Sequence, residues 1–153
     1  MRDGRGLGRG ISALILTAAA IPLLGNGGGR TQDVSVTVTE LRSAKGKVLA
    51  CLTAKPKAFP DCNKDPQALS MTVDAGNTVR FTFRGVAPGT YAISLLHDEN
   101  GNGKADKALM IPREGFGFSR DAKVQMGPPK FAAAAFPVAS DPVHQRIRMR
   151  YLF

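Results

Sequence analysis

The sequence predicts an all-β protein, an antiparallel β-sandwich of about seven strands with one short helix near residues 129–135. Two observations predict this fold: apolar and polar residues alternate in short runs from residue 33 onward, and Gly, Pro and Asn residues separate the runs. Each strand then has one apolar face that must be buried, which requires two packed sheets. The chain of 153 residues is 43% hydrophobic, which suits one domain and excludes a multidomain enzyme.

Each element is predicted from its own pattern. Val34, Val36 and Val38 stand between Ser and Thr residues, as in a strand with one buried face. Residues 128–136 open with two prolines and continue with alanines, which indicates a helix of one or two turns. The strands are expected over residues 34–39, 48–52, 69–74, 79–84, 91–95 and 146–153, and the last of these has the clearest alternation.

The N-terminal residues have the pattern of an export signal. Arg2, Arg5 and Arg9 precede an uncharged stretch from Ile11 to Gly25, which is too short to span a hydrocarbon core of roughly 30 Å as a helix. The alternative is an anchor that is not cleaved. We therefore expect a signal peptide and flexible linker over residues 1–30 and a β-sandwich domain over residues 31–153, exported to the periplasm or secreted and not stably inserted in the membrane after cleavage.

The charge balance is strongly basic. The net charge is +9, and removing residues 1–25, which carry three Arg and one Asp, leaves +7. A positive surplus favours contact with anionic surfaces such as phosphate-bearing lipid or polysaccharide, although it also serves simple solubility. Export makes nucleic acid an improbable partner.

The chain contains two cysteines, Cys51 and Cys62, which are 11 positions apart. In an exported protein such a pair predicts a disulfide, because oxidising compartments preserve the bond. A metal site would need further spaced Cys or His residues, and catalytic redox use would favour a C-x-x-C spacing. By the loop-entropy model, the bond contributes about 3 kcal/mol to stability.

The segment from His97 to Asp106 resembles a calcium loop. Its D-x-N-x-N-G-x-x-D spacing matches the first nine positions of an EF-hand loop, in which short oxygen-bearing side chains converge on one ion. The predicted ligands are the side chains of Asp98, Asn100, Asn102 and Asp106 and the carbonyl of Lys104.

Leu109 stands where an EF-hand has its bidentate Glu, and Glu114 is a further candidate to complete the shell. With two carboxylates in the loop, the expected affinity for calcium is only about 10⁻⁴ to 10⁻³ M. The alternative is a loop without an ion, in which Asn-Gly pairs supply left-handed turn residues and the Asp and Asn side chains bind their own backbone.

The sequence predicts no catalytic residues. His97 lies beside Asp98, but no serine in a strand-turn-helix context accompanies them, and residues 117–121 fail the G-x-S-x-G pattern. The GFGFS segment has two interpretations: a tight loop whose Phe116 and Phe118 cap the core, or exposed rings that stack on sugars.

Four segments in order carry a resemblance to a family: PGTYAISLLHDENGNGKAD (88–106), IPREGFGFS (111–119), GPPKFAAAAF (127–136) and the basic final strand. Over residues 34–153, the chain resembles the exported bacterial proteins grouped as domain of unknown function 2141. The resemblance implies a β-sandwich of prealbumin-like or Cna-B-like type and no established activity.

Together, these patterns predict an exported, non-catalytic module that binds or assists other components at the cell envelope. The expected partner is an envelope polysaccharide or another envelope protein, and the candidate cofactor is calcium. The alternatives are a carbohydrate-binding module or a small envelope hydrolase.

Overall fold

The computed structural model describes residues 29–103, 107–108, 111–112 and 114–152. Residues 1–28 of the predicted signal peptide and linker, and two of the predicted calcium ligands, Lys104 and Asp106, lie outside these residues. The elements in chain order are β1 Gln32–Thr39, β2 Lys47–Thr53, β3 Leu69–Asp74, β4 Val79–Val86, β5 Gly89–Asp98, β6 Lys107–Ala108, β7 Ile111–Pro112, β8 Gly115–Phe118, the 3₁₀ turn η1 Ser119–Asp121, α1 Phe131–Ala134, β9 Phe136–Val138 and β10 Val143–Arg148.

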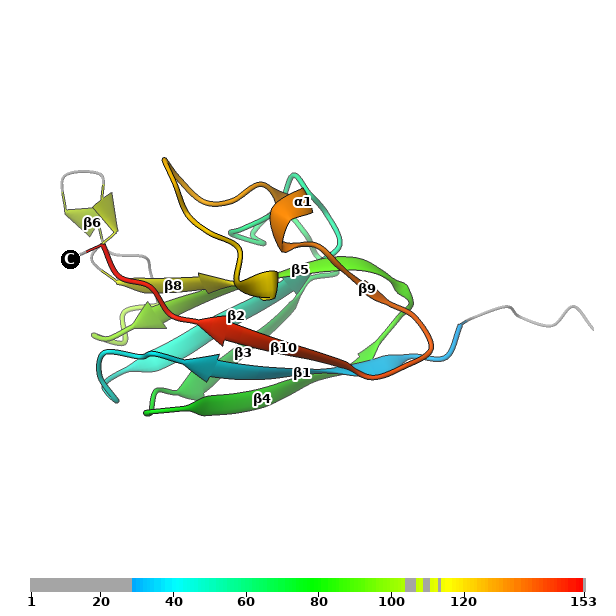
Figure 1. Ribbon diagram of the computed structural model, residues 1–153, viewed down its shortest axis with the longest axis horizontal. Helices are drawn as coiled ribbons and strands as arrows, with labels where there is room; N and C mark the ends of the chain where they lie inside the picture. Colours follow the sequence, from blue (N-terminus) through cyan, green and yellow to red (C-terminus); the bar gives the residue numbers. More distant parts are fainter. Residues whose placement is uncertain (1–28, 104–106, 109–110, 113, 153) are drawn as a thin grey trace, which may run out of the picture.

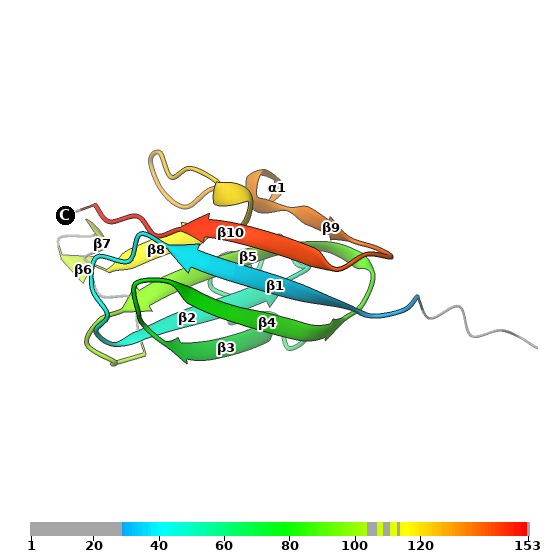
Figure 2. The same ribbon diagram turned by 60° about the horizontal axis from the view of Figure 1, so that its bottom comes forward.

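Two packed sheets form a β-sandwich, which confirms the predicted all-β fold. Sheet A has the strand order β10-β1-β4, and sheet B has the order β3-β2-β5-β8, with β9 pairing the first part of β5. Figure 1 and Figure 2 show β10, β1 and β4 as one layer over β3, β2 and β5. The short strands β6 and β7 pair only with each other. Among the described residues, no helix is long and apolar enough to cross a membrane.

The last strand differs from its prediction in position and direction. β10 covers Val143–Arg148 rather than residues 146–153, and it runs parallel to β1, although all other pairs are antiparallel. The alternation continues past Arg148, but β1 ends at Thr39, so the chain changes partner. Arg150 then exchanges two backbone hydrogen bonds with Phe116 of β8, at 2.8 and 2.9 Å, and so joins the two sheets at this edge.

The main core lies between the sheets and consists of the inward side of each alternating run. Sheet A contributes Val34, Val36 and Val38 from β1, and the facing residues of sheet B include Leu52 and Ile93; all five are almost completely buried. Because every second residue of a strand points to the same face, the alternation in the sequence defines this core directly.

A second, smaller core covers the outer face of sheet B. Its buried members are Ala92, Phe118, Ala122 and Ala134, and Phe59 packs its ring edge against Phe118 at a centroid distance of 5.6 Å. The loop that carries Phe59 is attached to β2 by the disulfide, and α1 lies where the short helix was predicted. Consequently, one outer face of the sandwich is covered, whereas no second core of described residues covers the outer face of sheet A.

Candidate functional site

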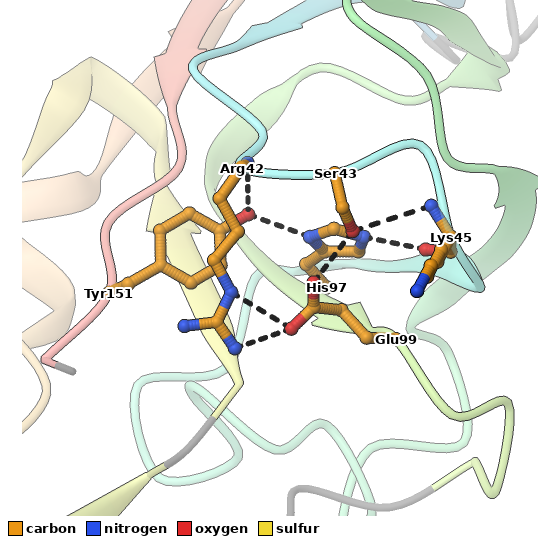
Figure 3. A network of polar contacts seen from close by, with 6 residues as sticks. All are labelled: Arg42, Ser43, Lys45, His97, Glu99 and Tyr151. Atoms are coloured by element: carbon orange, nitrogen blue, oxygen red, sulfur yellow. Dashed lines mark hydrogen bonds and ion pairs between the residues drawn. The ribbon is translucent and has the colours of Figure 1, made fainter.

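One end of the sandwich gathers most of the polar residues that the sequence singled out. His97 and Asp98 end β5, and the loop after β1 and the C-terminal segment come to lie beside them. We call Arg42, Ser43, Lys45, His97, Glu99 and Tyr151 the end network; Figure 3 shows how their side chains, and the backbone groups of Arg42 and Lys45, meet.

His97 lies at the centre of the end network and is completely buried. Its Nε2 lies 2.8 Å from the carbonyl oxygen of Lys45, and its Nδ1 lies 2.6 Å from the hydroxyl of Tyr151. Because a carbonyl can only accept, Nε2 donates to Lys45, and in the neutral ring Nδ1 then accepts from the Tyr151 hydroxyl. That hydroxyl in turn accepts the backbone N–H of Arg42 at 3.1 Å. Both ring nitrogens are therefore engaged inside the protein.

Glu99 closes the network through an ion pair with Arg42, whose Nε donates to the carboxylate at 2.9 Å. The Ser43 hydroxyl donates to the other carboxylate oxygen at 2.6 Å. The hydrogen bond from Arg42, supported by that from Ser43, outweighs partial burial and lowers the pKa of Glu99 to about 2. The Arg42 guanidinium also lies 4.5 Å from the ring centroid of Tyr151, a cation–π contact, and burial raises the pKa of that tyrosine.

Two glycines make this close packing sterically accessible. Gly46 has a φ of +72°, and a Cβ there would overlap the backbone of Asp98 and Glu99. A Cβ on Gly115 would overlap the ring of Tyr151. Gly46 thus allows the close approach of the chain at Asp98 and Glu99, and Gly115 leaves room for the Tyr151 ring.

The segment after Asp98 is an ordered turn. The Asp98 side chain is buried, and its carboxylate accepts the backbone N–H groups of Gly101, Asn102 and Gly103 at 2.8, 3.2 and 2.7 Å. The Asn100 side chain accepts the N–H of Asn102 at 3.0 Å. The predicted bonding of Asp and Asn to their own backbone is therefore confirmed.

The predicted calcium site is only partly within the described residues. Asp98, Asn100 and Asn102 share the turn, whereas Lys104 and Asp106 lie outside the described part of the chain. Glu114 is buried, and its charge acts on Arg42 of the end network. Within the described part of the chain, no three His, Cys, Asp or Glu side chains are grouped as a metal site.

The other predicted site residues lie on sheet B or, in the case of Cys62, in the loop that covers it. Cys51 and Cys62 are joined by a disulfide with their Cα atoms 6.4 Å apart, as predicted. The GFGFS segment is strand β8 rather than a loop, because it pairs with residues 94–97 of β5. Phe118 is only 5% exposed and belongs to the second core, whereas Phe116 is half-buried, so Phe116 alone of the two has surface for stacking.

Ser119 and Asp121 are polar residues whose roles the sequence analysis missed. The Ser119 hydroxyl donates to the carbonyl of Ala134 at 2.6 Å and accepts the N–H of Ile93 at 2.9 Å, and so links β5 to α1. Asp121, with a φ of 52°, accepts hydrogen bonds from Arg148 and Arg150. A serine at the end of an apolar segment is only a weak sequence signal of a buried hydrogen-bonding role. For Asp121, the neighbouring sequence contains no signal of its pairing with the two arginines.

These observations define the class: an all-β sandwich whose family motifs build one polar end and one covered sheet face. The family model described as "Uncharacterized protein conserved in bacteria (DUF2141)" matches residues 36–146, and the chain belongs to this family. No curated protein sequence and no solved structure matches the chain. The likeness to prealbumin-like or Cna-B-like domains therefore stays a prediction.

Proposed function

We propose that this protein is an exported, non-catalytic module that acts by binding a component of the bacterial cell envelope. The observation that carries this proposal is that three side chains able to act as a base or nucleophile are buried and hydrogen-bonded inside the protein. His97, Ser119 and Asp98 are each at most 1% exposed, and each uses its polar atoms on internal partners. A general base or nucleophile needs an accessible lone pair within reach of substrate. These three residues instead support the fold on which a binding surface is carried.

The disulfide between Cys51 and Cys62 supports the export part of the proposal. Such bonds persist in the periplasm and outside the cell, and are rare in the reducing cytosol. The bacterial family and the basic charge of the chain fit a partner in the envelope, where anionic polymers and lipids are abundant.

The test is to incubate the purified protein with isolated peptidoglycan, lipopolysaccharide and defined polysaccharides. We expect retention on at least one of them, with no soluble fragment released from the ligand. Release of fragments that grows with time would identify a hydrolase instead. Absence of retention on all of them would reject the binding role. If retention survives high salt and is lost in Phe116→Ala, the ligand stacks on sheet B as a carbohydrate-binding module would.

We also propose a weak calcium site in the loop from Asp98 to Asp106. The support for this proposal is the D-x-N-x-N-G-x-x-D spacing, together with the turn that holds Asp98, Asn100 and Asn102 in one short loop. At ten times the dissociation constant, calcium should stabilise the fold by about 1.4 kcal/mol. The melting temperature should therefore rise by a few degrees in 10 mM calcium relative to chelator, and less in Asp106→Asn. Equal melting temperatures would leave the turn without an ion.

A further inference from the structure

The outer face of sheet A is the open face of the sandwich, and it is basic. Its outward residues alternate with the valines and phenylalanines of the main core, which fixes which side chains face solvent. The central strand β1 contributes one acid, Asp33, and otherwise short hydroxyl side chains, whereas the two flanking strands contribute cations. The outward residues are Asp33, Ser35, Thr37 and Thr39 on β1, Arg80, Thr82 and Arg84 on β4, and His144, Arg146 and Arg148 on β10; of these, Thr37 is itself buried between its neighbours.

The strand register places one arginine on each side of Thr37. Thr37 is paired with Arg80 of β4 on one side and with Arg146 of β10 on the other. Since neighbouring strands lie about 4.8 Å apart, the two arginine backbones stand about 10 Å apart across the sheet. Their long side chains therefore flank a strip of short residues.

The neighbouring row of the sheet continues this strip with hydrogen-bonding groups. Ser35 pairs with Thr82 and with His144, and the Nε2 of His144 lies 3.4 Å from the hydroxyl of Thr37. Together with Arg80, these residues line a shallow hollow of about 300 Å³ that is open to solvent. This volume is at the lower limit for a small-molecule pocket, and the open shape suits a segment of a longer chain.

Three of the four arginines of this face are not neutralised by an ion pair within the described part of the chain. Arg80, Arg84 and Arg146 are exposed and form no ion pair with any described residue. By contrast, Arg148 at the edge of the face is paired with Asp121. Asp33 of β1 lies beside this part of β4, where its carboxylate accepts the backbone N–H of Gly85 at 3.2 Å.

We propose that this face binds a segment of an anionic polysaccharide, with Arg80 and Arg146 holding its acidic groups. The proposal rests on the envelope-binding function above and assigns it a face and a ligand class. Guanidinium groups bind carboxylate or phosphate with two parallel hydrogen bonds, and the hydroxyls and imidazole between them match sugar hydroxyls. A membrane surface fits less well, because the exposed large apolar residues of the described chain, Leu69, Met126 and Leu152, lie off this face.

The test compares two double variants that lose the same charge from opposite sides of the sandwich. Arg80→Gln with Arg146→Gln changes the proposed face. Lys57→Gln with Lys64→Gln removes two exposed cations from the loop that covers sheet B, and is the matched control. Binding of each purified protein to immobilised polygalacturonate, to neutral dextran and to phosphatidylglycerol vesicles is measured at low and physiological salt, with melting temperatures recorded in parallel.

We expect the unmodified protein to bind polygalacturonate and not dextran. The arginine variant should bind at least tenfold more weakly, the lysine control within twofold, and both should melt like the parent. Equal losses in the two variants would mean that only overall charge matters and would overturn the assigned face. Preference for vesicles would overturn the ligand class. If the protein is retained on whole peptidoglycan but the arginine variant is retained equally well, the binding function stands and this face is wrong.

Discussion

The end network and the outer face of sheet A use similar side chains in opposite ways. In the end network, Arg42 is paired with Glu99 and lies over Tyr151, and both nitrogens of His97 have internal partners. On sheet A, Arg80 and Arg146 face solvent without an ion pair among the described residues. The comparison teaches that the polar groups of the end network are engaged with one another in the fold, whereas Arg80 and Arg146 keep exposed guanidinium groups, which is why we propose the binding role for sheet A.

The two histidines of the chain give the sharpest test of this contrast, with the largest expected effect. His97→Ala removes a buried ring and leaves the Lys45 carbonyl and the Tyr151 hydroxyl without their partner, which should cost about 3 to 4 kcal/mol of unfolding free energy. His144→Ala, on the exposed face, should change it by no more than about 0.5 kcal/mol. Urea unfolding of both variants measures the difference. Equal losses of unfolding free energy in the two variants would contradict the contrast between the buried end network and the exposed face of sheet A.

The disulfide should matter next most, because it attaches the loop that covers sheet B. Replacing Cys51 and Cys62 by alanine should lower the free energy of unfolding by about 3 kcal/mol, chiefly because the unfolded chain without the bond has more conformational entropy. Hydrogen exchange should increase around Phe59 and Phe118 and stay unchanged in sheet A. A variant as stable as the parent would show that the second core holds this loop without the bond.

A smaller effect is expected from acid titration of the end network. The pKa of Glu99 is lowered in the folded protein to about 2 from an ordinary value of 4.5, so its ion pair stabilises the fold above pH 4.5 and this contribution is lost as the pH falls toward 2. Because Arg42 is partly exposed, we expect only about 1 kcal/mol. Glu99→Gln should lose that amount at pH 7 and approach the parent at pH 2. A difference in unfolding free energy between Glu99→Gln and the parent that stays constant at all pH values would contradict an origin in the ion pair.

Much of the fold could be predicted from local pattern, because a strand with one buried face records that face in its alternation. The runs beginning at Val34, Leu69 and Val79 became β1, β3 and β4 almost unchanged. The parallel pairing of β10 with β1 could not be predicted, because alternation says which face is buried and not which strand lies beside it. Strand β8 was missed since two of its four residues are glycines, which weaken any strand signal.

The candidate site divides in the same way. The turn organised by Asp98 was predictable, because its hydrogen bonds span only three to five residues. The contact of His97 with Tyr151 joins residues 54 positions apart. The placement of Arg80 and Arg146 beside Thr37 brings together residues of three separate strands. Such juxtapositions depend on topology, so neither the end network nor the basic face could be recognised before the strands were ordered.

The central claim is that the polar end maintains the fold and that sheet A binds the ligand. The most direct measurement records both melting temperature and polygalacturonate binding for Tyr151→Phe and for Arg80→Gln with Arg146→Gln. Tyr151→Phe leaves His97 Nδ1 and the Arg42 N–H without a partner, which should cost about 1 to 2 kcal/mol and lower the melting temperature by several degrees while binding stays within twofold. The arginine variant should bind at least tenfold more weakly and melt like the parent. Loss of binding in folded Tyr151→Phe, with binding kept in the arginine variant, would contradict the account.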